Sequence, residues 1–225
     1  MTSFRIDFLY RGGRFLAKVF LPTFGSMVVE GRENLPKAGP LLIASNHQSY
    51  TDPAVLIYAI DRPVWWMAKG SLFNGWLVSW FLRQLHMFGV NRQKQDLAAL
   101  GHAQRLLDEG RALVMFPEGT RHPGALGRGH DGMAYIAMRT GVPIVPVAIT
   151  GTELIRHVVR TPFHFQKLKV VIGKPYTLAN VYGRIDKQQL LNMTDKIMES
   201  IAELLPQEYR GVYNEAVTES VDSGP

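Results

Sequence analysis

Short apolar runs alternate with longer segments of helical periodicity along most of the chain. Runs typical of buried strands cover residues 41–44, 64–67, 112–116, 142–149 and 168–172. Helical patterns begin at Asp52-Pro53 and cover residues 71–83, 95–108, 132–139 and 186–204. This alternation predicts an α/β fold with a largely parallel mixed sheet flanked by helices.

The first part of the chain has a different pattern, in which aromatic and basic residues are interspersed. Residues 4–20 place Phe4, Phe8, Phe15 and Phe20 among Arg5, Arg11, Arg14 and Lys18. This pattern predicts an amphipathic, membrane-associating helix, although Gly12-Gly13 weakens the prediction of one continuous helix. We expect this helix in residues 1–25, one domain in residues 26–206 and a partly disordered tail in residues 207–225.

Charge and composition narrow the classes of partner. The 225 residues carry a net charge of +6 and no cysteine, which favours anionic partners and excludes disulfides and a cysteine nucleophile. No apolar run reaches the roughly 20 residues of a spanning helix, and no signal peptide is recognisable. We therefore expect a protein that sits on a membrane, at its cytoplasmic face, rather than one that crosses it.

All four tryptophans lie between Trp65 and Trp80. Within this part of the chain, apolar residues recur at helical spacing at Leu72, Phe73, Trp76, Leu77, Trp80 and Phe81. Such a stripe fits a helix packed into the core, which is the commoner case. It fits an interfacial surface equally well, because tryptophan favours the membrane boundary.

The first segment that carries chemistry follows the apolar run at 41–44. His47 lies in the loop after this predicted strand, and Asp52 begins the next predicted helix. A histidine here can act as a general base, and a nearby carboxylate can fix its tautomer. The alternative is that Asp52 only caps a helix and His47 is an ordinary polar loop residue.

A second segment, Phe116-Pro117-Glu118-Gly119-Thr120-Arg121, also follows a predicted buried strand. Arg121 offers a planar fork of donors that suits a phosphate, and Gly119 permits close backbone approach. Arg92, after another short apolar run, is a weaker candidate for the same role. Taken separately, each arginine fits a solvated surface residue as well.

In combination, these segments resemble the 1-acyl-glycerol-3-phosphate acyltransferase family, the lysophosphatidate acyltransferases. The resemblance covers roughly residues 25–175 and rests on His-x-x-x-x-Asp at 47–52, Arg92, Phe-Pro-Glu-Gly-Thr-Arg at 116–121 and Val-Pro-Ile-Val-Pro-Val at 142–147. It implies a glycerolipid acyltransferase domain in residues 26–206. It also implies an enzyme of phospholipid synthesis that forms phosphatidic acid.

The resemblance assigns roles to individual positions. His47 and Asp52 would be catalytic, the first as base and the second as its orienting partner. The substrate-binding positions would be Arg92, Glu118, Gly119, Thr120 and Arg121. Many family members carry a lysine where this chain has His130, which leaves that phosphate contact open to Arg128.

The implied partners are a lysophospholipid acceptor, an acyl thioester of coenzyme A or acyl carrier protein, and a membrane surface. We expect no metal and no cofactor beyond the donor, since His122, His130 and Asp131 lack a recognised ligand spacing. We also expect no nucleic acid, because no nucleic-acid-binding motif is present. A dinucleotide fingerprint at 127–132 is displaced from its strand. The remaining alternatives are another lysophospholipid acceptor and a non-catalytic lipid-binding protein.

Overall fold

The computed structural model describes residues 3–23, 25–91, 96–155, 161 and 165–216. Its strands are β1 (Ser26–Glu30), β2 (Leu41–Ser45), β3 (Val64–Lys69), β4 (Met87–Val90), β5 (Ala112–Met115), β6 (Ile144–Thr150) and β7 (Lys167–Ile172). Its α-helices are α1 (Ser3–Thr23), α2 (Asp52–Ala59), α3 (Trp76–Gln84), α4 (Leu97–Asp108), α5 (Gly132–Thr140) and α6 (Lys187–Ala202). Short 3-10 helices include η2 (Gly70–Phe73) and η3 (Thr152–Leu154).

The strands form one sheet in the order β1-β7-β6-β2-β5-β3-β4. Neighbours pair in parallel throughout, except that β7 runs antiparallel to β6. The largely parallel mixed sheet predicted from the sequence is therefore confirmed. Because β2 to β6 run in one direction, the loops after these strands emerge at the same edge of the sheet, where open α/β sheets bind ligands.

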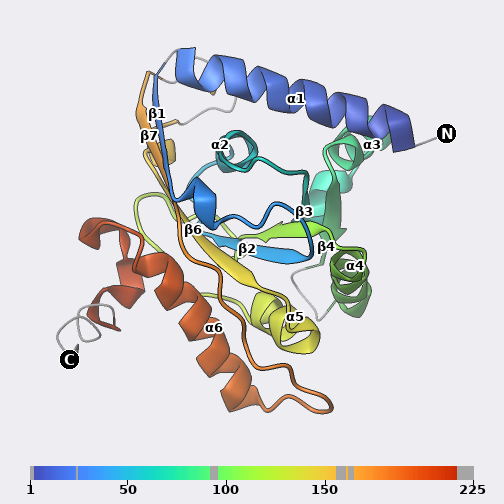
Figure 1. Cartoon of the computed structure of the whole chain (residues 1–225), viewed down its shortest axis with the longest axis vertical. Helices are drawn as coiled ribbons and strands as arrows, with labels where there is room; N and C mark the ends of the chain where they lie inside the picture. Colours follow the sequence, from blue (N-terminus) through green and yellow to red (C-terminus); the bar gives the residue numbers. More distant parts are fainter. Residues whose placement is uncertain (1–2, 24, 92–95, 156–160, 162–164, 217–225) are drawn as a thin grey trace.

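Helices cover both faces of the sheet (Figure 1). Successive side chains of β2 point to opposite faces, so Leu42 and Ala44 pack with α4, α5 and α6, whereas Leu41 and Ile43 pack with α2 and the end of α1. All five residues of β2 are buried. This central position, between β5 and β6, gives the loop after β2 a rigid support.

The N-terminal helix is continuous through Gly12-Gly13 and packs along α2. Tyr10 is buried, and its hydroxyl accepts a hydrogen bond from the Val64 backbone N–H at 3.1 Å. Asp61, just after α2, accepts from Arg14 and Lys18 of α1 at 3.1 and 2.8 Å. One face of α1 is thus bound to the domain. No helix among the described residues is long and apolar enough to cross a bilayer.

The structure differs in places from the pattern of the sequence. The helix expected at 71–83 is split, because Gly75 adopts φ +101° between η2 and α3. β1 was not foreseen, since its alternating exposure gives no continuous apolar run. Asp52 does not cap α2: it is the first helical residue, after Thr51. Within the residues expected to form the tail, Tyr213 is buried against the core.

Candidate active site

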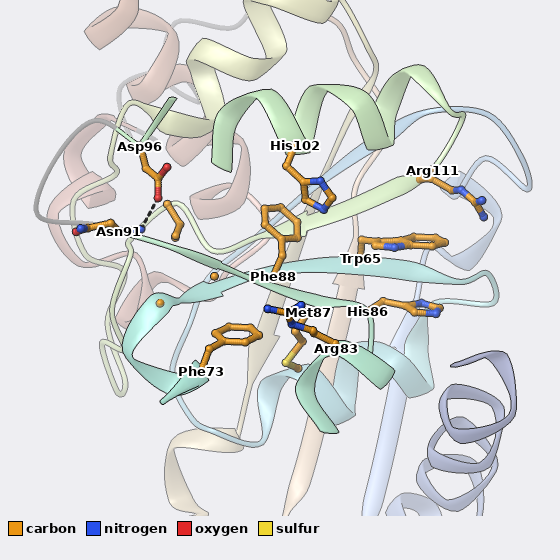
Figure 2. A pocket seen from close by; sticks show the side chains of 13 residues that line it. Trp65, Phe73, Arg83, His86, Met87, Phe88, Asn91, Asp96, His102 and Arg111 are labelled. Carbon is orange, nitrogen blue, oxygen red and sulfur yellow. Dashed lines mark hydrogen bonds between the residues drawn. The ribbon is translucent and has the colours of Figure 1, made fainter. Parts of the chain in front are cut away.

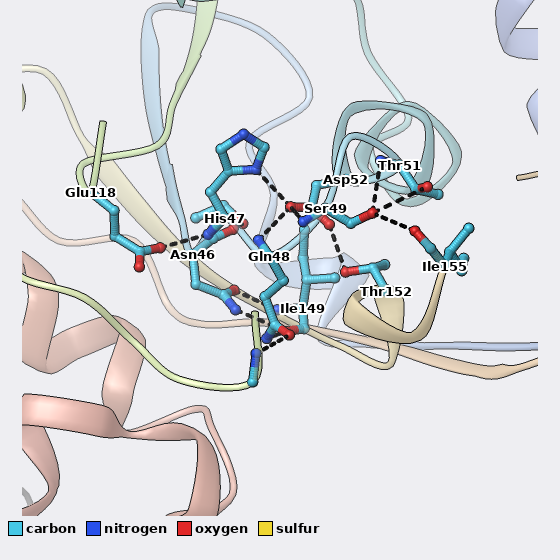
Figure 3. A network of polar contacts seen from close by, with 12 residues as sticks. Asn46, His47, Gln48, Ser49, Thr51, Asp52, Glu118, Ile149, Thr152 and Ile155 are labelled. Atoms are coloured by element: carbon cyan, nitrogen blue, oxygen red, sulfur yellow. Dashed lines mark hydrogen bonds and ion pairs between the residues drawn. The ribbon is translucent and has the colours of Figure 1, made fainter. Parts of the chain in front are cut away.

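His47 and Asp52 meet at the carboxyl edge of the sheet (Figure 3). The His47 Nδ1 lies 2.7 Å from Asp52 Oδ2, and the Asp52 side chain is 0 % exposed, against 16 % for that of His47. A buried carboxylate at this distance favours the tautomer with hydrogen on Nδ1. The other ring nitrogen, Nε2, is then left as a proton acceptor, as a general base requires.

Asp52 is held by four donors in all. Its Oδ2 also accepts from the backbone N–H groups of Gln48 and Ser49, at 2.7 and 2.9 Å. Its Oδ1 accepts from the Thr152 hydroxyl at 2.6 Å. These two N–H groups belong to the loop that carries His47, so Asp52 shapes this loop. Thr152, fully buried in η3, was missed by the sequence analysis, because it lies 100 residues away in the chain.

The segment that follows β5 also holds His47 in place. Phe116, the first residue after β5, stacks on the His47 ring with centroids 4.1 Å apart. The His47 carbonyl accepts from the backbone N–H of His122 at 2.7 Å. The two motif loops are therefore packed against each other, and the imidazole has little freedom to turn.

Glu118 links the same two loops through hydrogen bonds. It is buried, and its Oε1 accepts from the backbone N–H of His47 at 2.6 Å, while its Oε2 accepts from that of Gly127 at 2.7 Å. Burial raises the pKa of the Glu118 carboxyl to about 7, although the two N–H donors pull this pKa downward. In the described structure, the carboxylate holds the backbone of the base, and both its oxygens face protein donors.

Arg121 and Thr120 are exposed at the mouth of the site. The Arg121 guanidinium lies over the ring of Tyr50, 3.5 Å from its centroid. A cation on a tyrosine face gains attraction from the ring quadrupole. Since Tyr50 is three residues from His47, this contact holds the guanidinium beside the loop of the base. The sequence analysis had not identified Tyr50.

Gly119 has φ +66°, and a Cβ at this position would lie 2.7 Å from the His130 ring. Glycine is therefore needed here for both conformation and space. His130 is exposed, and its backbone N–H donates to the Pro117 carbonyl at 2.8 Å. Arg92 lies outside the described residues, so its role stays a prediction. Within the described ranges, no cluster of three or more His, Cys, Asp or Glu could hold a metal ion.

A cavity of about 460 Å³ opens beside this site. Phe116 and Gly119 form its wall next to the base. Most of its lining is apolar, with Met67, Leu100, Met115 and Met133 among the side chains, although Asn91, Asp96, His130 and Asp131 also line it. Such a lining suits a hydrocarbon chain better than a charged group.

A histidine held by a buried acid in this way can take a proton from a hydroxyl group. A family model described as Acyltransferase matches residues 26–150. The chain is 31% identical over 189 residues to a 1-acyl-sn-glycerol-3-phosphate acyltransferase of Bacillus subtilis, covering 83% of this chain and 92% of that protein.

A similar protein of Borreliella burgdorferi is 34% identical over 130 residues, which is 56% of this chain and 52% of that one. The crystal structure of the 1-acyl-sn-glycerophosphate acyltransferase PlsC from Thermotoga maritima matches with a TM-score of 0.67 and 26% identity, over 98% of this chain and 82% of that chain. The chain belongs to the acyltransferase family and is an enzyme of this type.

Proposed function

We propose that this enzyme transfers a fatty acyl group from a thioester to the free hydroxyl of 1-acyl-glycerol-3-phosphate, forming phosphatidic acid. The observation that carries the proposal is the 2.7 Å contact between His47 Nδ1 and the fully buried Asp52. It leaves His47 Nε2 as the base. The names of the relatives point to the same acceptor.

The reaction needs no covalent enzyme intermediate, because a thioester is already activated. His47 Nε2 takes the proton of the acceptor hydroxyl as its oxygen attacks the thioester carbonyl. The tetrahedral intermediate then breaks its carbon–sulfur bond, and the protonated His47 returns the proton to the departing thiolate. Asp52 stabilises the imidazolium between these two steps.

Arg121 is the group we assign to the acceptor phosphate. Its guanidinium lies over the ring of Tyr50, which belongs to the loop of His47, and a planar fork suits a phosphate. Glu118 turns both oxygens to backbone N–H groups, so we assign it to positioning of His47 and not to direct substrate contact. The apolar cavity of about 460 Å³ would take an acyl chain.

Acyl transfer with purified protein tests the proposal. One labelled acyl thioester is offered with a panel of lysophospholipids, and the products are identified by mass spectrometry. We expect fastest transfer to lysophosphatidate. Arg121→Lys, which keeps the charge but loses the fork, should raise the KM of this acceptor more than that of the donor. Faster transfer to an uncharged-headgroup acceptor would overturn the assignment.

Association with a membrane surface is the second part of the proposal. Trp76, Leu77 and Trp80 of α3 are exposed, Trp76 by 82 %. Phe15 and Leu16 on the outer side of α1 are exposed as well, and α1 contacts α3. The apolar stripe of α3 is thus not packed in the core, and exposed apolar side chains gathered on one helix favour an interaction site. We propose that these exposed side chains contact a lipid bilayer, and that the protein lies at the cytoplasmic face of the membrane.

Flotation with vesicles of phosphatidylglycerol and phosphatidylcholine tests this surface. Trp76→Ala with Trp80→Ala should reduce binding without lowering the melting temperature, because both side chains are exposed. Tyr182→Ala, which removes another exposed aromatic side chain, is the control. Since Arg14 and Lys18 already pair with Asp61, high salt should weaken binding only in part. Unchanged flotation of the double variant would exclude this surface.

A further inference from the structure

The C-terminal segment that follows α6 packs against loops that support the catalytic pair. It forms the short 3-10 helices η5 (Gln207–Tyr209) and η6 (Gly211–Tyr213). Tyr209, the last residue of η5, is partly buried. Its hydroxyl group contacts η3, and its carbonyl group contacts the loop after β5. One residue of this segment thus joins two loops that are distant from each other in the chain.

The contact with η3 leads to the catalytic acid. The Tyr209 hydroxyl donates to Glu153 Oε1 at 2.7 Å. Glu153 directly follows Thr152, whose hydroxyl donates to Asp52 Oδ1 at 2.6 Å (Figure 3). The second oxygen of Glu153, Oε2, is buried and has no hydrogen-bond partner in the described structure. Burial and the adjacent Glu153 carboxylate raise the pKa of Tyr209 to about 12, so the hydroxyl stays protonated near neutral pH and remains a donor.

Loss of this hydroxyl should therefore be felt at Asp52. A partly buried carboxylate that loses a donor is unfavourable, so Glu153 would turn toward solvent. A single 3-10 turn has poor hydrogen-bond geometry of its own, and η3 would follow the movement of this side chain. The hydrogen bond from Thr152 to Asp52 would then lengthen. Asp52 keeps its three other donors, so the effect should be moderate.

The Tyr209 carbonyl supports a second group that holds the catalytic loop. It accepts from the backbone N–H of Leu126 at 2.8 Å. The next N–H along the chain, that of Gly127, donates to Glu118 Oε2 at 2.7 Å, and Glu118 holds the backbone of the base. A Cβ at Gly211, where φ is +53°, would clash with the Leu126 carbonyl oxygen. The C-terminal segment therefore lies directly on this loop.

Tyr209 lines neither of two cavities that could hold a substrate. A cavity of about 830 Å³ lies beside β4, with His102 of α4 on one side of this strand and Phe73 of η2 on the other (Figure 2). The cavity of about 460 Å³ reaches Phe116 and Gly119, but its described lining includes no residue of η3 or of the C-terminal segment. Replacement of Tyr209 should therefore change kcat and leave the KM values of donor and acceptor unaltered.

We propose that Tyr209 is a positioning residue, which couples the C-terminal segment to two supports of the His47–Asp52 pair. Its hydroxyl fixes η3 and, through Thr152, the carboxylate of Asp52. Its carbonyl fixes the loop to which Glu118 is bound. Groups that orient a catalytic side chain need support of this kind, because their own conformations must be held. The kinetic tests of the inference rest on the proposed acyl transfer, whereas its hydrogen-exchange test needs no substrate.

Tyr209→Phe removes the hydroxyl and keeps both the ring and the carbonyl. We expect it to lower kcat about fivefold, within the range that one hydrogen bond contributes, with the KM values of both substrates unchanged. Tyr176→Phe is the matched control, because the Tyr176 hydroxyl lies 3.0 Å from Ser200 Oγ. Tyr176 pairs with Ile144 at the start of β6, whereas η3 follows the end of this strand. The control variant should retain the parent kcat.

A double-variant cycle tests whether the hydroxyl acts through Thr152. Tyr209→Phe combined with Thr152→Val should lower kcat no further than Thr152→Val alone, because the second substitution removes the hydrogen bond on which the first one acts. Losses of kcat that multiply would overturn the proposal. An unchanged kcat in Tyr209→Phe, a raised KM, or an equal loss of kcat in Tyr176→Phe would overturn it as well.

Amide hydrogen exchange of the resting protein distinguishes failure of this inference from failure of the proposed reaction. The N–H groups of Gln48 and Ser49 are held by Asp52, whereas the N–H of Gly127 is held by Glu118. Exchange of each amide reports local opening of the loop that carries it. The three amides can therefore be followed by nuclear magnetic resonance without donor or acceptor.

Tyr209→Phe should speed the exchange of the two amides held by Asp52 about fivefold. Gly127 should exchange as in the parent protein, because the carbonyl at position 209 still accepts from Leu126. If this pattern appears and Tyr176→Phe leaves all three rates unchanged, the positioning role stands even when no transfer to lysophosphatidate is detected. Equal acceleration of all three amides, or none, refutes the role even when transfer is observed.

Discussion

Replacing Glu118 with glutamine separates the positioning of His47 from the stability of the fold. The carboxylate accepts from the N–H groups of His47 and Gly127 at 2.6 and 2.7 Å. A glutamine keeps one acceptor oxygen but turns an NH2 group toward the second N–H donor. One of the two loops must then move. A displacement of about 1 Å at a catalytic group can cost about a hundredfold in rate.

The substitution Glu118→Gln should lower the catalytic rate but should not lower the free energy of unfolding. Burial raises the Glu118 pKa from 4.5 to about 7, and one pKa unit corresponds to about 1.36 kcal/mol. A raised folded-state pKa contributes stability that is complete below pH 4.5 and is lost as the pH rises through about 7. Above pH 7 the ionised Glu118 therefore costs roughly 3 kcal/mol relative to a neutral side chain. Glu118→Gln should be at least as stable as the parent protein at pH 8.

Two measurements together decide the case. Steady-state kinetics at pH 8 should show a kcat of Glu118→Gln about a hundredfold lower, with the KM values of both substrates nearly unchanged. Denaturant unfolding at pH 5 and pH 8 should show the variant gaining stability relative to the parent protein as the pH rises. Glu33→Gln, at an exposed position, is the control for loss of charge. A higher KM for lysophosphatidate with kcat preserved would mean that Glu118 contacts the acceptor, and the positioning argument would be refuted.

Three further substitutions probe the remaining parts of the site. His47→Ala should lower kcat about a hundredfold or more with an unchanged thermal melt; near-normal turnover by the folded variant would remove the base assignment. Thr152→Val deletes the 2.6 Å hydrogen bond to Asp52 and should lower kcat about tenfold. Thr152→Ser keeps the hydroxyl and should retain the parent kcat. An equal loss of kcat in both variants would mean that Thr152 acts through packing. Tyr50→Ala should raise the KM of lysophosphatidate several-fold because Arg121 loses its support, while Tyr50→Phe should not, and identical KM values in the two variants would contradict that support.

The sequence determined those parts of the protein that depend on neighbouring residues. A continuous apolar run such as that of β2 can only be a buried strand or core segment. His47 and Asp52 are five residues apart in the chain, so their pairing is local. The α/β class follows from the same alternation. For these features, the chain's own periodicity and the short reach between side chains leave few other arrangements.

Tertiary structure decided everything that joins distant segments. Glu118 reaches His47 from 71 residues away, and its motif marked it without indicating this contact. Thr152 reaches Asp52 from 100 residues away, and no local pattern marks it. The apolar stripe that includes Trp76 and Trp80 could pack inward or face solvent, and in the folded protein these two side chains are exposed, whereas Trp66 of β3 is buried. Motif spacing along the chain identifies side chains that can take part in catalysis. The order of the strands in the sheet then determines which of these side chains lie close together.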